Sequence, residues 1–116
     1  MATAVDGVLK KRAHKRYIVS GAAEIELDGC KILGRVVSVG AGGLLVYCDL
    51  TPPLGAKIAI EFSVNGFDEG RPIIARGMVV WTQPGRVGVE FLEDPPGLIV
   101  LLLWLEREHC CWSGTD

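Results

Sequence analysis

The sequence lacks a long hydrophobic run, and this excludes a helix that spans a membrane. The longest uninterrupted apolar stretch, from Leu98 to Leu105, has eight residues, whereas a spanning helix needs about 18 or more. The residues before Lys10 also lack the basic start and the apolar stretch of a secretion signal. We therefore expect a cytoplasmic protein that is not bound to a membrane.

Residues that form disulfides or hold metals are also scarce. No C-x-x-C spacing occurs among the four cysteines, which are Cys30, Cys48, Cys110 and Cys111. The adjacent pair cannot easily bridge to itself in relaxed geometry, so we expect reduced thiols. A metal site at His109-Cys110-Cys111 would find only one other histidine and two scattered cysteines in the chain. We therefore expect no metal and no cofactor.

Catalytic groups are equally sparse. No candidate nucleophile has a histidine beside it, and the carboxylates fall mostly on strand faces that we expect to be exposed to solvent. The chain is therefore predicted not to be an enzyme.

Charge is distributed unevenly along the chain. The 116 residues carry 12 basic and 14 acidic side chains, but five of the basic ones gather near the N-terminus, at Lys10, Lys11, Arg12, Lys15 and Arg16. A cationic arm on an acidic body is typical of a protein that binds an anion, such as a nucleic acid, an anionic lipid surface or a phosphorylated small molecule. A solvated arm without a specific ligand explains the same pattern.

Alternation of apolar and polar residues predicts six β-strands in one domain, residues 1–116. In the first strand, Ala23, Ile25 and Leu27 alternate with acidic residues, and Asp28-Gly29 is a favoured hairpin turn. The others are expected at residues 31–37, 42–48, 57–62, 72–82 and 86–92. Their short, turn-marked spacing favours an all-β fold, an antiparallel sheet closed into a small barrel over residues 17–93.

A C-terminal helix over residues 94–109 is predicted to follow the barrel. Asp94 is a suitable N-cap, with Pro95 at the first helical position. From Leu98 to Leu105 the helix is apolar all round, so we expect it to bury two sides. One side would pack on the barrel. The other would pack on a second subunit, making a homo-oligomer, or be buried within the same subunit.

Two features of the first half of the chain suit an anionic ligand. Arg12 and Arg16 carry planar guanidinium groups that match phosphate oxygens or the O6/N7 edge of guanine, and together they would form a clamp. The glycine-rich turn at residues 38–43 lets the backbone approach a ligand, and Ser38 adds a hydroxyl group. Taken singly, each feature is more often solvated surface or an ordinary hairpin turn.

Taken in order, these motifs resemble the PilZ domain, the bacterial receptor module for the second messenger cyclic di-GMP. The R-x-x-x-R opening of that family matches residues 12–16, and its [D/N]-x-S-x-x-G element falls on residues 36–41. The closing strands of the family resemble residues 79–81 (VVW) and 88–91 (GVEF). The resemblance covers about residues 9–93.

The resemblance implies a six-stranded antiparallel PilZ-type barrel that binds cyclic di-GMP on its outer surface, under the N-terminal arm. The implied binding residues are Arg12, Arg16, Val36, Ser38, Gly40, Ala41, Gly42 and Trp81. Val36 replaces the hydrogen-bonding Asp or Asn of the family, and Ala41 replaces its glycine, a change whose cost a one-residue shift of the turn would absorb in part. Trp81 would stack on a guanine or, as its apolar strand neighbours favour, belong to the core or rim.

We therefore expect a non-catalytic cyclic di-GMP receptor that orders its mobile arm, residues 1–16, over the barrel and so signals to a protein partner. The alternative is a degenerate PilZ adaptor that binds no nucleotide and acts through protein contacts, for which Val36 and Ala41 are the evidence. Binding of single-stranded nucleic acid is disfavoured. Such proteins offer several exposed aromatic side chains, and the main candidates here are Tyr17, Tyr47 and Trp81.

Overall fold

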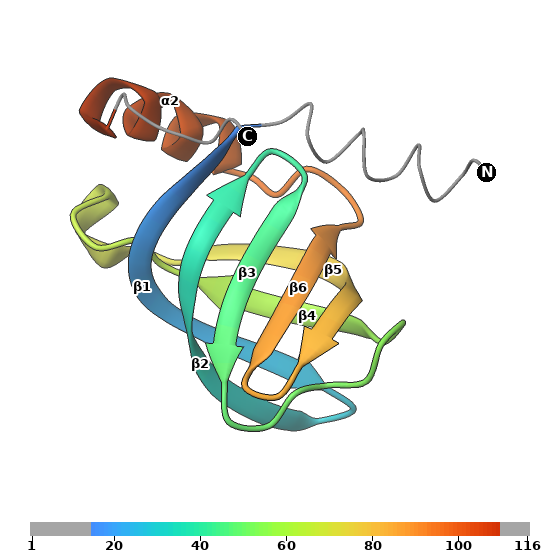
Figure 1. Ribbon diagram of the computed structural model, residues 1–116. Coiled ribbons are helices and arrows are strands. Elements are labelled where there is room, and N and C mark those ends of the chain that lie inside the picture. Colours follow the sequence, from blue (N-terminus) through green and yellow to red (C-terminus); the bar gives the residue numbers. More distant parts are fainter. Residues whose placement is uncertain (1–14, 110–116) are drawn as a thin grey trace.

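The computed structural model describes residues 15–109 and consists of six antiparallel strands and one C-terminal helix (Figure 1). The strands are β1 (Arg16–Leu27), β2 (Cys30–Gly40), β3 (Gly43–Cys48), β4 (Lys57–Phe62), β5 (Ile73–Gln83) and β6 (Arg86–Phe91). A short 3-10 helix, η1 (Asp68–Gly70), lies between β4 and β5, and α2 (Leu98–His109) follows β6.

The strands close into a barrel in the order β1-β2-β3-β6-β5-β4, with β4 pairing back onto β1. This confirms the predicted six-stranded antiparallel barrel with a C-terminal helix. The β1–β2 hairpin turns at Asp28 and Gly29, whose φ angles of 52° and 81° suit the favoured two-residue hairpin turn. Within residues 15–109, no helix is both long and apolar enough to cross a membrane.

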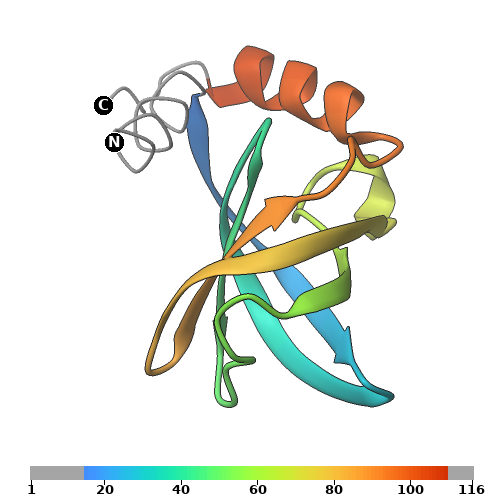
Figure 2. The same cartoon turned by 90° about the vertical axis from the view of Figure 1, so that its right-hand side faces the viewer.

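Inward-facing residues of all six strands form a single core, which α2 covers at one end. Figures 1 and 2 show α2 lying across the end of the barrel at which β1 begins and β2 ends. Leu98, Leu101 and Leu105 are buried against the barrel core. Their spacing of three and four residues places them on one face of the helix. The helix therefore buries one stripe.

For this helix, the expected start is wrong and one of the two alternatives for its second side is excluded. It begins at Leu98 rather than near Pro95, because Gly97 has a φ of 89° and a right-handed helix cannot pass through that conformation. The helix also does not bury two sides within one copy of the chain. Ile99, Val100 and Leu103 retain 67%, 59% and 61% exposure on the face that points away from the barrel.

Candidate ligand-binding site

Arg16, one of the two predicted clamp residues, opens β1 and is exposed at the end of the barrel. It pairs with Gly40, the last residue of β2, so it lies beside the glycine-rich turn that joins β2 to β3. The other clamp residue, Arg12, lies outside the described residues, as does the predicted arm up to His14. The structure thus brings Arg16 and the glycine-rich turn together.

A β-bulge in β2 separates Val36 from Ser38. Val36 pairs with Val46 of β3 and Ser38 with Leu45, so two steps along β2 match one step along β3. Because alternate residues of a strand face opposite sides, the extra residue reverses the alternation. Val36 has 0% exposure in the barrel core. The expectation that its side chain faces a ligand on the outer surface is therefore wrong.

Ser38 belongs instead to a row of outward-facing residues that crosses five strands. Successive cross-strand partners in this row are Ile18, Ser38, Leu45, Gly88 and Trp81. We call this row the outer wall. With neighbouring strands 4.7–4.9 Å apart, Ser38 and Trp81 lie roughly 14 Å apart along it. The two predicted site residues therefore share one face of the barrel.

Ser38 and Trp81 differ in accessibility, although both belong to the outer wall. Ser38 is only 8% exposed, whereas Trp81 is 38% exposed and its ring packs against Gly88, where an added Cβ would lie 3.5 Å from it. Trp81 is thus a rim residue with a ring available for stacking.

The glycine-rich turn tolerates Ala41 without strain. Ala41 is exposed and does not have a positive φ. Gly42, beside it, is partly buried. Glycine is required at the ends of the turn instead: a Cβ at Gly43 would collide with the carbonyl oxygen of Val89, and one at Gly40 would lie 2.7 Å from that of Lys15. The alanine at position 41 therefore does not obstruct the turn.

The root of the arm, Lys15 to Tyr17, contacts α2 through Glu106. The Lys15 ammonium donates to both Glu106 carboxylate oxygens, at 3.1 and 3.2 Å, and the Tyr17 hydroxyl donates to Oε1 of the same carboxylate. Hydrogen bonds from Tyr17 and Lys15 lower the pKa of Glu106. Burial, together with the Glu106 carboxylate, raises the pKa of Tyr17 to about 12. Glu106 is thus ionised and Tyr17 is neutral at physiological pH.

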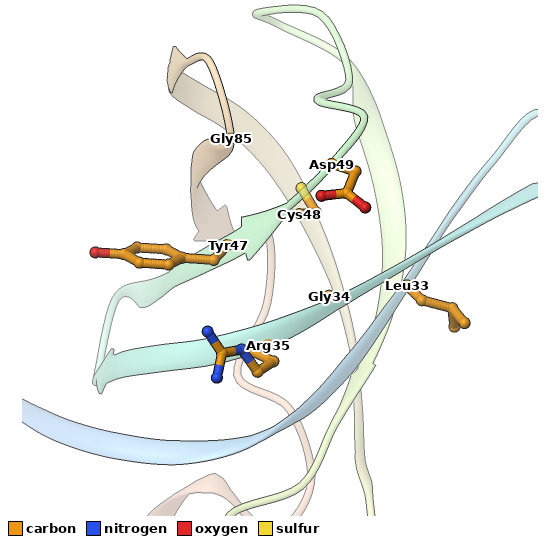
Figure 3. Close-up of a pocket in the computed structure, with 7 residues that line it drawn as sticks. All are labelled: Leu33, Gly34, Arg35, Tyr47, Cys48, Asp49 and Gly85. Atoms are coloured by element: carbon orange, nitrogen blue, oxygen red, sulfur yellow. The ribbon is translucent and has the colours of Figure 1, made fainter.

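A shallow hollow of about 480 Å³ lies elsewhere on the barrel and holds none of the predicted site residues (Figure 3). It is lined by Leu33, Gly34, Arg35, Tyr47, Cys48, Asp49 and Gly85. Arg35 and Tyr47 are cross-strand partners, and the Arg86 guanidinium lies 5.4 Å from the centre of the Tyr47 ring. Burial and the nearby Asp49 raise the pKa of the Cys48 thiol, which is free. The hollow thus holds one arginine, Arg35, together with the carboxylate of Asp49.

Two features of this region were not predicted from the sequence. They are the contact of Glu106 with the root of the arm and the outward-facing positions of Ile18 and Leu45 on the outer wall. Glu106 lies 91 positions from Lys15, and no local pattern joins them. Ile18 and Leu45 follow from strand alternation only when the bulge in β2 is known.

Comparisons with known proteins agree on one family. The sequence profile of the PilZ domain matches residues 10–105. No curated protein matches the sequence. Three solved structures share the fold with TM-scores of 0.61 to 0.69.

The first of these structures is the inhibitor of motility MotI/DgrA of Bacillus subtilis. It has a TM-score of 0.69 and 18% identity over 84% of this chain, which spans only 50% of that protein. The PilZ domain of YcgR from Escherichia coli, solved with c-di-GMP, has a TM-score of 0.62 and 17% identity, covering 82% of this chain and 91% of that one. The PilZ domain of CeSA from a cellulose-synthesizing bacterium has a TM-score of 0.61 and 16% identity, covering 78% and 97%.

Proposed function

Because the chain belongs to the PilZ domain family, we propose that it is a non-catalytic receptor for cyclic di-GMP. The observation that carries the proposal is the position of Arg16, exposed beside the glycine-rich turn and at one end of the outer wall. A structure of the same fold, the PilZ domain of YcgR, was solved with this ligand.

The chemistry of the ligand suits the residues that meet at this place. Cyclic di-GMP offers two phosphates and two guanine bases, and guanidinium forks bind either group with two parallel hydrogen bonds. Arg16 and Arg12 would supply the forks, and the exposed Trp81 ring would supply a stacking surface. Ser38, nearly buried, would contribute a hydroxyl to the floor beneath the ligand.

Signalling would follow from ordering of the arm over the outer wall. Five like charges in residues 10–16 repel one another, so a doubly anionic ligand favours the arm conformation that surrounds it. The bound arm would then change the surface that a partner protein meets.

Isothermal titration calorimetry with cyclic di-GMP tests the proposal. Arg16→Ala should weaken binding about 10- to 100-fold, because a hydrogen bond to a charged group contributes about 1.5–3 kcal/mol. Arg71→Ala, which removes an exposed arginine from the β4–β5 loop, is the matched control and should bind like wild type. The melting temperatures of both variants should equal that of wild type.

The hollow provides the competing location, and Arg35→Ala tests it. If Arg35→Ala abolishes binding and Arg16→Ala does not, the ligand sits in the hollow and the arm is not part of the site. If neither variant changes a measurable wild-type affinity, both locations are wrong.

The second candidate function is an adaptor that binds no nucleotide. The exposed apolar face of α2, formed by Ile99, Val100 and Leu103, favours it because three neighbouring large apolar side chains on a helix suit a protein contact. A second copy of the chain is one occupant of this face and would make a homo-oligomer. Absence of binding heat and of chemical-shift changes with high-micromolar cyclic di-GMP would favour the adaptor over the receptor.

A further inference from the structure

The root of the arm is held from two sides. On one side, Glu106 of α2 accepts hydrogen bonds from the Lys15 ammonium and the Tyr17 hydroxyl. On the other side, the Lys15 carbonyl lies so close to Gly40 that even an added Cβ would come within 2.7 Å of it. The Lys15 carbonyl therefore lies against the end of β2, while its exposed side chain reaches Glu106 of α2.

Glu106 is held both at its backbone, through the packing of α2, and at its carboxylate, through Tyr17. Its neighbour Leu105 and the preceding turn's Leu101 have 0% exposure in the core, which fixes this part of α2. Tyr17 is 7% exposed and belongs to the same core, so its hydroxyl holds the carboxylate independently of Lys15. The Tyr17 hydroxyl therefore gives the half-exposed Glu106 carboxylate a second partner besides Lys15.

Lys15 lies between the two clamp arginines in the sequence, one residue before Arg16. Holding Lys15 therefore restrains the backbone next to Arg16 at the start of β1. A segment whose root is already ordered loses less conformational entropy on binding than one that is free.

We propose that Glu106 is a positioning residue of the cyclic di-GMP site, which holds Lys15 and the adjacent Arg16 beside the glycine-rich turn through its ion pair with Lys15. This inference rests on the proposed receptor function. It makes α2 part of the binding site although Glu106 itself does not touch the ligand.

A double-mutant cycle between Lys15 and Glu106 tests this role. Glu106→Ala should weaken cyclic di-GMP binding about three- to tenfold in calorimetry, and in a Lys15→Ala background the same change should have less than a twofold effect. Glu106→Gln, which keeps an acceptor for the Tyr17 hydroxyl but loses the ion pair, should weaken binding nearly as much as Glu106→Ala. Glu108→Gln, which neutralises an exposed carboxylate on the last turn of α2, is the control and should bind like wild type.

Three results would overturn the positioning role. Glu106→Ala could bind more tightly than wild type, which would mean that the carboxylate repels the ligand or competes with it for Lys15. It could bind equally well with only a lower melting temperature, which would make Glu106 purely structural. The loss could also persist in full without Lys15.

A ligand-free measurement separates this inference from the proposed function. In ¹⁵N relaxation experiments, Glu106→Ala should lower the backbone order parameters of Lys15 and Arg16, and Glu108→Gln should not. If wild type binds no cyclic di-GMP, the receptor function fails, and the order parameters alone then decide whether Glu106 fixes the root. Unchanged order parameters would refute the inference in either case.

Discussion

Replacing Val36 by aspartate should unfold the barrel rather than create a ligand contact. The PilZ motif has Asp or Asn at the position that aligns with Val36, so sequence alone suggests that Val36→Asp would tighten binding. Val36 is fully buried opposite Val46, however, and no partner for a carboxylate is found among the core residues, all but one of which are apolar. The motif alignment therefore predicts tighter binding by Val36→Asp, whereas the structure predicts unfolding.

The cost has two parts that can be estimated. Loss of a buried valine side chain removes about 1.5–3 kcal/mol of transfer free energy. Keeping an aspartate of pKa about 3.9 protonated at pH 7 costs roughly 4 kcal/mol more. The sum of about 5.5–7 kcal/mol rivals the whole stability of an ordinary domain, about 5–15 kcal/mol.

Urea unfolding followed by circular dichroism, at pH 7 and pH 4, measures both parts. A buried carboxyl has a raised pKa in the folded state, so its cost grows as pH rises above 3.9 and nearly vanishes at pH 4. The difference from wild type should thus shrink to about 2–3 kcal/mol at pH 4. Ala41→Asp, on the exposed turn, is the control for charge and should match wild type.

If Val36→Asp does not fold at pH 7, Val36→Thr supplies the measurable variant, with an expected loss of about 1–3 kcal/mol from a buried hydroxyl group. A stable Val36→Asp protein that binds cyclic di-GMP more tightly would show that the side chain faces outward and that the bulge is misplaced.

Two further predictions concern α2 and the root of the arm. Leu103→Glu should convert a homo-oligomer to a monomer in sedimentation equilibrium, because it places a charged side chain at the centre of the exposed apolar face. A wild-type protein that is already monomeric would contradict this interface. Wild type should lose stability between pH 10 and 12, because burial and Glu106 raise the pKa of Tyr17 to about 12 while the unfolded chain ionises near 10. Tyr17→Phe should lack that loss in thermal melts, and an identical pH dependence in both proteins would show that Tyr17 does not cause it.

The strands and the barrel could be predicted from the sequence because each strand has one solvent-exposed and one buried face. Ile58, Ile60 and Phe62 alternate with exposed residues in β4, and all three are buried as the pattern requires. The start of the C-terminal helix could not be predicted. Asp94 and Pro95 indicate an earlier start, and the left-handed conformation of Gly97 that delays it is set by packing rather than by the sequence pattern.

The site was predicted in part. The motif spacing predicts Arg16 and Ser38 as ligand contacts, which stays a prediction, and the structure places them on neighbouring strands. Val36 was assigned to the wrong face because strand parity assumes an unbroken ladder, and the bulge depends on pairing with β3, which a single strand does not reveal. Glu106 escaped because contacts between residues far apart in the chain leave no periodic trace.

Closure of the sheet limits how another protein can recognise this one. Every strand within residues 15–109 has a hydrogen-bonded neighbour on each side along at least part of its length, since β4 pairs with both β5 and β1. In residues 15–109, an extended peptide would therefore find only short unpaired stretches, such as residues 30–33 of β2, along which to add a strand, the route that many peptide-binding domains use. A partner protein that recognises the liganded state would instead contact side chains, either those of the arm or those that α2 presents to solvent.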